Sequence, residues 1–438
     1  MTERETIYAP ATAPGRAAIS IIRISGPGSG RAVSRICGVL PPPRRARRAR
    51  FCDPAKGEVL DDGLLLWFPG PKSVTGEDVA ELHCHGSRAV LSALFAVLRG
   101  EGLRLAEPGE FTRRAFENGK LDLLEAEAIA DLAAAETEAQ RRQAIRQLAG
   151  ALGALYRGWS ERLTRALAHL EAAIDFPEED LPPEIEAAVA AETASLEKEI
   201  SEHLADERRG ERLRDGISVA ILGAPNAGKS TLLNRIARRE AAITSPLPGT
   251  TRDIVEVAID LGGYPVLLAD TAGLRESADP IEAEGLKRAL ARAEEAELRL
   301  FVFDARNPEE AEAAAAWPRE TTLLLANKCD LLSRKCALPK GAFAVSAKTG
   351  EGLDALLSTL AAKIAESYET TAPLLTRARH REALEEALAA LSRARSAPLP
   401  ELKAEDLRLA SRSLGRITGA VDVEDLLGVI FRDFCLGK

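Results

Sequence analysis

Short runs of apolar residues alternate with polar ones in the first quarter of the chain. The segments AAISIIRISG and LLLWFPGP have the pattern of strands, whereas SRAVLSALFAVLRG carries apolar residues at helical spacing. Glycine and proline interrupt these segments often, as they do where short elements are joined by tight turns. The pattern predicts a compact α+β domain over residues 1–119.

Longer helical patterns follow this region. No proline occurs between Leu121 and Phe176, and the apolar residues there recur at helical spacing. A segment rich in alanine, leucine and glutamate returns after Pro373. The two segments can form separate bundles, but burying their apolar faces against each other is simpler. We expect one all-helical domain, with residues 120–212 as its first part and 373–438 as its second.

The region between the helical segments, residues 213–372, has a different pattern. Apolar runs with the length of buried strands alternate with helical stretches, and these runs are ISVAILG, PVLLAD, LRLFVFD, TTLLLAN and AFAVSA. Such alternation is typical of a mostly parallel sheet that is covered by helices. The sequence therefore predicts an α/β domain that is inserted into an all-helical domain and preceded by an α+β domain.

Composition narrows the setting of the protein. Of the 438 residues, 67 are acidic and 58 are basic, and the net charge of −9 argues against general binding of nucleic acid through a global positive field. Any contact with nucleic acid has to be local. The chain has no run of 18 apolar residues and no apolar leader, and its six cysteines form no CxxC pair. These features favour a cytoplasmic protein without a membrane segment.

A phosphate-binding motif lies where the first strand of the α/β region meets a helix. The sequence GAPNAGKS at residues 223–230 fits G-x-x-x-x-G-K-[ST] and stands between ISVAIL and STLLNRIA. Its main-chain N–H groups and the helix N-terminus suit a phosphate. Lys229 is expected to bridge the β- and γ-oxygens as a catalytic residue, and Ser230 to offer its hydroxyl to Mg²⁺. The residues of this motif expected to contact the nucleotide are Asn226, Ala227, Gly228, Lys229, Ser230 and Thr231.

Two later motifs complete the predicted phosphate site. Thr251, in GTTRD, is the candidate for a further Mg²⁺ ligand and for a sensor of the γ-phosphate. Asp270 ends the strand PVLLAD, where its carboxylate can accept a hydrogen bond from magnesium-bound water. The N–H of Gly273, in the same DTAG motif, can reach the γ-phosphate. Together the three motifs predict a site for a nucleotide with Mg²⁺.

The sequence NKCD closes the strand LLLAN and indicates selection of guanine. The Asp330 carboxylate can accept from the ring N–H and the exocyclic amine of guanine, and adenine lacks that amine, which would leave the carboxylate without its donor. Asn327 is expected at the other edge of the base, and Lys328 along its ring. The residues of a further motif, expected to supply a main-chain N–H to the guanine carbonyl, are Ser346, Ala347 and Lys348. The ordered motifs predict a GTPase that binds GTP/GDP.

The sequence leaves open how the attacking water is oriented. Where Ras-like enzymes carry a glutamine for this task, the chain has Leu274, which cannot perform it. Glu276 and Glu282 lie downstream in the same region and are candidates, although a solvated glutamate at a helix start is the more common case.

Several segments outside these motifs resemble the MnmE (TrmE) family of tRNA-modification GTPases. They are APGRAAISIIRISG, PGEFTRRAFENGKLDL, AEAIADL, AIDFPEED and the terminal FCLGK, and the nucleotide motifs match as well. The resemblance covers essentially the whole chain. It implies a GTP hydrolase in which K⁺ takes the place of an arginine finger when two G domains pair, with Glu282 orienting the water. The implied potassium ligands are Asn226, Ser245, Leu247 and Thr250.

The resemblance also implies one-carbon chemistry on tRNA. A homodimer formed through the N-terminal domain would bind 5-formyl-tetrahydrofolate or methylene-tetrahydrofolate. With an FAD-dependent partner of the MnmG type, in a heterotetramer, it would install an aminomethyl or carboxymethylaminomethyl group on carbon 5 of the wobble uridine of certain tRNAs. By motif position, Arg23, Lys120 and Lys438 suit the folate glutamate tail, and Glu81 suits donors on the pterin. The alternative is a ribosome-assembly or regulatory GTPase switch, which would need no folate-binding domain.

Two clusters have no place in these motifs. His83-Cys84-His85 contains metal-ligand residue types, but alternating strand residues explain it better because no second ligand cluster lies nearby in the sequence. The stretch PPPRRARRAR, which ends at Arg50, is the densest basic segment. We expect a solvated loop there, although the arginines could also touch a tRNA backbone.

Overall fold

The computed structural model of the chain describes residues 4–175, 183–240, 256–270, 291–332, 338–368, 374–421, 427, 430, 431, 434 and 437. Contacts divide the chain into two compact units. The first comprises residues 1–130, 147–193 and 390–438, and the second comprises 131–146 and 194–389. Neither unit coincides with one region of the sequence, and the four domain limits given above stay predictions.

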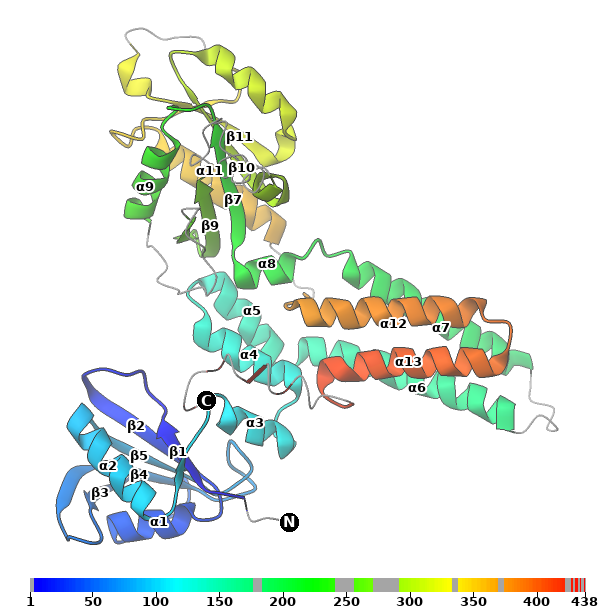
Figure 1. Cartoon of the computed structure of the whole chain (residues 1–438). Helices are drawn as coiled ribbons and strands as arrows, with labels where there is room; N and C mark the ends of the chain where they lie inside the picture. The colour runs from blue at the N-terminus through cyan, green and yellow to red at the C-terminus, as the bar shows by residue number, and fades with distance from the viewer. Residues whose placement is uncertain are drawn as a thin grey trace, which may run out of the picture. The chain divides into compact units, whose positions relative to one another are not determined.

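The N-terminal region of the first unit contains a six-stranded sheet (Figure 1), with the order β3-β4-β5-β2-β1-β6. Its strands are β1 (Ile7–Pro10), β2 (Ala17–Ser25), β3 (Arg47–Cys52), β4 (Val59–Phe68), β5 (Val79–Gly86) and β6 (Arg104–Leu105). The helices of this region are α1 (Ser29–Cys37), α2 (Arg88–Gly100) and α3 (Glu110–Glu117). Buried residues of α1 and α2 share one core with residues of β1 to β5. The α+β domain predicted from the sequence is confirmed.

Strand β5 explains the His83-Cys84-His85 sequence. Cys84 is buried in the core that the strands share with α1 and α2, whereas His85 is exposed, so the three residues alternate as in any half-buried strand. Burial raises the pKa of the Cys84 thiol to about 11. Within the described part of the chain, no group of three or more histidine, cysteine, aspartate or glutamate residues could hold a metal ion. The interpretation as alternating strand residues is confirmed.

The prediction of a loop in the basic stretch is wrong for the second half of that stretch. Residues Arg47–Cys52 form β3, which pairs with β4 in antiparallel register. Ala49 and Phe51 point into the core, and these two apolar positions are enough to fix the register of a short strand. The sequence concealed this alternation because arginine occupies most of the remaining positions.

The helices outside the two sheets are long, as predicted, except for one of seven residues at Arg209–Asp215. They are α4 (Leu123–Ala134), α5 (Glu138–Leu148), α6 (Ala151–Asp175), α7 (Pro183–Leu204), α8 (Arg209–Asp215), α12 (Ala378–Ser396) and α13 (Pro400–Thr418). Figure 1 shows α13 running alongside α6, and the Arg408 guanidinium of α13 lies 2.9 Å from the Glu171 carboxylate of α6. Helices that precede and follow the α/β region therefore pack together, and the insertion of the α/β domain into a helical domain is confirmed.

The second unit contains the α/β sheet, with the order β12-β11-β10-β7-β9-β8. Its strands are β7 (Ile217–Gly223), β8 (Glu256–Leu261), β9 (Tyr264–Asp270), β10 (Leu298–Asp304), β11 (Thr322–Asn327) and β12 (Phe343–Ala344). Helices α9 (Lys229–Arg239) and α11 (Leu353–Tyr368) accompany them, with 3₁₀ turns at Pro308–Ala316, Arg319–Thr321 and Cys329–Leu331. All neighbouring strands are parallel except β8 and β9, so the predicted mostly parallel sheet is confirmed.

Both faces of this sheet are covered. Val219 and Ile221 of β7 belong to a core that includes buried residues of α9 and α11, whereas Ala220 and Leu222 belong to a second core. A central parallel strand that is buried on both faces has to be apolar throughout, and β7 has that pattern. Since the strands are parallel, the carboxyl ends of β7, β9, β10 and β11 meet at one edge, which is where ligands bind in sheets of this type.

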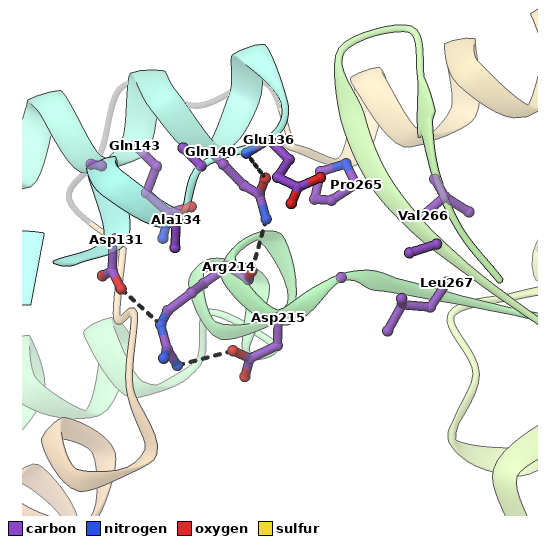
Figure 2. A pocket seen from close by; sticks show the side chains of 14 residues that line it. Asp131, Ala134, Glu136, Gln140, Gln143, Arg214, Asp215, Pro265, Val266 and Leu267 are labelled. Atoms are coloured by element: carbon purple, nitrogen blue, oxygen red, sulfur yellow. Dashed lines mark hydrogen bonds and ion pairs between the residues drawn. The ribbon is translucent and has the colours of Figure 1, made fainter. Parts of the chain in front are cut away.

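Residues 131–146 attach to the opposite edge of the same sheet. The Ala139 N–H donates to the Gly263 carbonyl in the β8–β9 turn, and the Gln140 side chain donates to the Arg214 carbonyl just before β7, both over 2.9 Å. Figure 2 shows Gln140 and Arg214 among the residues that line a cavity of about 180 Å³, where the Arg214 guanidinium binds Asp131 over 3.0 Å. The cavity is therefore distinct from the ligand-binding edge of the sheet.

The described helices include none that is both long enough and apolar enough to cross a membrane.

Candidate functional site

The loop after β7 needs glycine because other main-chain and side-chain atoms approach it closely. Gly223 ends the strand with a φ of 134°, and a Cβ there would lie 1.8 Å from the carbonyl oxygen of Val302. Gly228 has a φ of 93°, and its Cβ would lie 2.3 Å from Asn327 Nδ2. Asn226 also has a positive φ, of 64°, which asparagine tolerates better than most residues. The motif predicted to bind phosphate thus has the strand, loop and helix that such binding requires.

Lys229, at the start of α9, folds back over this loop. It is buried, and its Nζ donates to the carbonyl oxygens of Gly223 over 2.8 Å and of Ala224 over 2.9 Å. Burial lowers the pKa of Lys229, and the charge of Asp270 acts in the opposite direction. The ammonium is therefore held inside the loop, where phosphate oxygens can replace the two carbonyls as its partners.

The two oxygen donors expected near Mg²⁺ come from neighbouring elements. β7 and β9 pair in parallel with Ile221 opposite Asp270, so the carboxylate of Asp270 lies at the edge of the sheet that carries the loop. Ser230 is exposed in the first turn of α9. A hydroxyl is a ligand that suits Mg²⁺, and a carboxylate nearby can accept a hydrogen bond from magnesium-bound water, while phosphate oxygens and water complete the shell of the ion. The residues present fit the ion.

Asn327 connects three motifs that are far apart in the sequence. Its side chain is buried, its Nδ2 donates to the Ala227 carbonyl over 2.7 Å, and its Oδ1 accepts from the Ala347 N–H over 2.9 Å. The amide thereby joins the phosphate loop, the end of β11 and the segment after β12. The sequence instead led us to expect Asn327 and the 346–348 segment at the base itself, and those contacts stay predictions.

Lys328 is held by a residue that the sequence did not single out. Its Nζ lies 2.9 Å from Oδ2 of Asp304, the last residue of β10. A hydrogen bond from Arg306, with a further contribution from Lys328, keeps the pKa of Asp304 well below its usual value, so the carboxylate stays charged. The one feature of the sequence that could have indicated Asp304 is its position. Like Asp270, it is a carboxylate at the carboxyl end of a buried parallel strand.

Asp330 is exposed beside this network, where a base can reach it. The hydroxyl of the buried Ser346 donates to Asp330 Oδ1 over 2.6 Å and accepts from the Thr349 N–H over 3.1 Å. Ser346 therefore orients the carboxylate. The structure brings the phosphate motif, Asp270, Asn327, Asp330 and Ser346 to the same edge of one sheet.

Several predicted site residues lie outside the described part of the chain. They are Ser245, Leu247, Thr250, Thr251, Gly273, Glu282 and Lys438.

Two of the residues predicted to contact folate, Arg23 and Glu81, lie together in the first unit. Arg23 of β2 lies opposite Glu81 of β5 in the sheet, and its Nε and Nη2 donate to Glu81 Oε1 over 3.1 and 3.0 Å. His83 Nε2 lies 3.4 Å from Glu81 Oε2, and the Phe111 ring lies beneath the Arg23 guanidinium. The side chain of Lys120 lies beside Gly76 instead, where an added Cβ would lie 3.2 Å from Lys120 Cε. Arg23 and Glu81 are thus bonded to each other, and the contacts predicted for each of them with a folate stay predictions.

The fold and this site define a P-loop GTPase. The phosphate loop with Lys229, the Asp270 carboxylate at the end of β9 and the Asp330 carboxylate of the NKCD motif lie at one edge of a mostly parallel sheet. Residues 6–120 match a family model described as the GTP-binding protein TrmE N-terminus, and residues 123–435 match one described as the MnmE helical domain. The chain belongs to the MnmE (TrmE) family.

Relatives support this assignment over their full length. The chain is 57% identical to a tRNA modification GTPase MnmE of Rhodospirillum rubrum and 58% identical to one of Paramagnetospirillum magneticum, and it covers 99% and 100% of these proteins with 99% of its own residues. Among solved structures, the G domain of the T. maritima FeoB iron transporter is 24% identical over 35% of this chain and 99% of that one, with a TM-score of 0.26. That score is too low to support any inference.

Replacing Asn327 with alanine is expected to weaken binding of GDP and GTP alike by about tenfold or more. The substitution leaves the Ala227 carbonyl and the Ala347 N–H without their partner, a loss of about 1–3 kcal/mol for each buried group. Nucleotide titration of the purified variant checks this. Asn307→Ala, at an exposed position of the same domain, is the control and should bind like the wild type. Equal affinity of the two variants would contradict the bridging role.

Proposed function

We propose that this chain hydrolyses GTP in the course of tRNA modification, with the nucleotide site at the edge of the α/β sheet as its GTPase centre. The observation that carries the proposal is the arrangement of Lys229, Asp270 and Asp330 at one sheet edge. It occurs in a chain that matches a tRNA modification GTPase over 99% of both lengths. In GTP hydrolysis the Lys229 ammonium and the N-terminus of α9 stabilise the negative charge that develops on the phosphates.

Selection of guanine rests on Asp330. Its carboxylate accepts from the two N–H donors of guanine, and Ser346 holds it in place by a hydrogen bond of 2.6 Å. Adenine offers no such pair, so its binding would leave the oriented carboxylate without donors, a loss of about 1–3 kcal/mol or more. The resident Mg²⁺ would be held by Ser230 and Thr251, and it would neutralise phosphate charge.

We further propose that K⁺ activates the hydrolysis. Asn226 is exposed on the phosphate loop, where a side-chain oxygen is accessible to a cation near the nucleotide. The remaining ligands would be Ser245, Leu247 and Thr250, and Glu282 would orient the attacking water. Two copies of the chain would pair through their G domains and thereby close the site.

The chemistry on tRNA belongs to the N-terminal region in this proposal. A folate one-carbon donor, 5-formyl- or methylene-tetrahydrofolate, would bind at the Arg23 and Glu81 cluster, and the pairing of the two residues favours a role for Arg23 in orienting the Glu81 carboxylate toward pterin donors. Lys120 and Lys438 would serve the glutamate tail. The chain would act as a homodimer with an FAD-dependent partner of the MnmG type, in the cytoplasm. The product would be a wobble uridine that carries an aminomethyl-type group on carbon 5.

Cells that lack this protein are expected to lose the C5-modified wobble uridines, because the proposed reaction requires the GTPase site of this chain. Mass spectrometry of tRNA nucleosides measures the loss. The wild-type chain should restore the modification, as should Lys198→Ala at an exposed helix position, but Lys229→Ala should not. Normal modification in the deletion strain would favour a ribosome-assembly or regulatory GTPase instead.

GTP turnover is expected to be at least about tenfold faster in potassium chloride than in sodium chloride at equal ionic strength, because the two ions differ in size and so in how they fit a fixed set of oxygen ligands. Steady-state phosphate release measures this ratio. Asn226→Ala should bring the two rates close together, whereas Asn307→Ala should keep the difference. Equal turnover of the wild type in both salts would overturn potassium activation.

Arg23→Ala in the full-length chain is expected to weaken binding of 5-formyl-tetrahydrofolate by about tenfold or more, since charge-assisted hydrogen bonds contribute about 1.5–3 kcal/mol. Isothermal titration calorimetry gives the affinity. The control is Arg88→Ala, an exposed arginine on α2. Unchanged affinity of the Arg23 variant would remove Arg23 from the folate site.

A further inference from the structure

One basic segment is absorbed neither by the nucleotide site nor by the Arg23 and Glu81 cluster. It consists of Arg44, Arg45, Arg47, Arg48 and Arg50, and we call it the basic edge strand. Its second half is β3, which stands at the end of the strand order and has a single neighbour, β4. The free edge of β3 therefore faces away from the sheet.

The arginines of this segment are exposed, and the core holds the strand that carries them. All five are exposed, whereas Ala49 and Phe51 between and after them are buried, so the core fixes the main chain while the charges stay in solvent. Arg48 and Arg50 are two residues apart on the strand, so they lie side by side about 7 Å from each other. The core thus presents the charges on a rigid strand.

The nearby carboxylates are already engaged. Asp62, opposite Arg50, receives two hydrogen bonds from Arg48, over 3.0 and 2.7 Å. Asp61 receives two from His85, both over 2.7 Å.

The remaining arginines therefore carry positive charge in excess. Within the part of the chain that the structure describes, Arg45 and Arg47 form no ion pair, and Arg50 shares Asp62 with Arg48. Arg44 donates to the Lys72 carbonyl, which brings a further lysine to the segment.

Protection of a sheet edge explains only part of this pattern. Charged side chains on an edge strand prevent pairing with other chains, and lysine is the usual residue for that purpose. Five arginines within seven residues exceed the need, and they repel each other unless an anion is bound. Arginine rather than lysine is the residue that binds phosphate in a bidentate manner. In a chain with a net charge of −9, contact with a polyanion requires such a local concentration of positive charge.

We propose that the basic edge strand binds the phosphate backbone of tRNA, with Arg45, Arg47 and Arg50 as its phosphate contacts. The inference rests on the proposed function, which supplies the RNA. Because phosphates carry no sequence information, this contact positions tRNA on the N-terminal region without selecting the wobble base.

The test is the salt dependence of tRNA binding by the full-length chain. A triple variant, Arg45→Gln, Arg47→Gln and Arg50→Gln, is compared with Arg31→Gln, Arg88→Gln and Arg99→Gln, a charge-matched control on α1 and α2. Each lost contact to a structured RNA lowers the slope of log K against log salt concentration by about 0.7–0.9. We expect the slope of the edge variant to fall by about 2 and its affinity at 0.1 M salt to fall at least about tenfold, with unchanged GTP turnover.

A second variant carries lysine at the same three positions, which keeps the positive charge and the protection of the sheet edge. It should retain the wild-type slope. This variant separates a loss of phosphate contacts from self-association of the glutamine variant through its sheet edge. Equal slopes for the wild type, the edge variant and the control would overturn the inference while leaving the proposed function intact. A wild-type chain that binds no tRNA would overturn the inference as well, whereas normal wobble uridines in the deletion strain would overturn the proposed function. Loss of binding to phosphatidylglycerol vesicles, with tRNA binding unchanged, would assign the strand to a membrane surface and overturn the assignment to RNA.

Discussion

The nucleotide site depends on the Asn327 carboxamide. This side chain is buried, and it joins the phosphate loop at Ala227 to the segment at Ala347, which lies 20 residues beyond it in the chain. Neither contact is local, so neither loop can hold its shape by main-chain propensity alone. A buried amide with both ends bonded is stable, whereas one with an unmatched end loses about 1–3 kcal/mol. The amide therefore couples the geometry of the phosphate loop to that of the segment at Ala347.

That coupling requires the parallel sheet. β7, β9, β10 and β11 run in the same direction, so Gly223, Asp270, Asp304 and Asn327 all arrive at one edge. At the opposite edge of the sheet, helix α5 forms hydrogen bonds with the β8–β9 turn and with Arg214, which lies just before β7. Strands β7 and β9 thus run from an attachment of residues 131–146 at one end to the nucleotide site at the other. A shift of either strand along its axis would change both the attachment of residues 131–146 and the geometry of the nucleotide site.

The N-terminal sheet divides its surfaces in a similar way. One face of the sheet packs against α1 and α2 in the core. Arg23, Glu81 and His83 alternate with the core residues and therefore lie on the other face. The edge strand β3 follows the same rule, since Ala49 and Phe51 are in the core while Arg48 and Arg50, which alternate with them, remain in solvent. Because successive side chains of a strand point to opposite faces, the sheet can bury one set of residues in the core and expose the Arg23 and Glu81 cluster and the β3 arginines.

The sequence by itself determined the features that depend on local geometry: the apolar strands, the glycines at 223 and 228, and the succession of the nucleotide motifs that identifies the class of protein. These are readable because each is set by the conformations and burial of adjacent residues. Only the tertiary structure decided which groups bond to one another. Asp304 as the anchor of Lys328, Asn327 as a bridge between loops, and the pairing of Arg23 with Glu81 all depend on strand order and register. The strand at Arg47–Cys52 was hidden for a related reason, because its two inward residues show their role only when β4 and the core lie beside them. Contacts between residues 20 to 100 positions apart arise from packing, which no local pattern records.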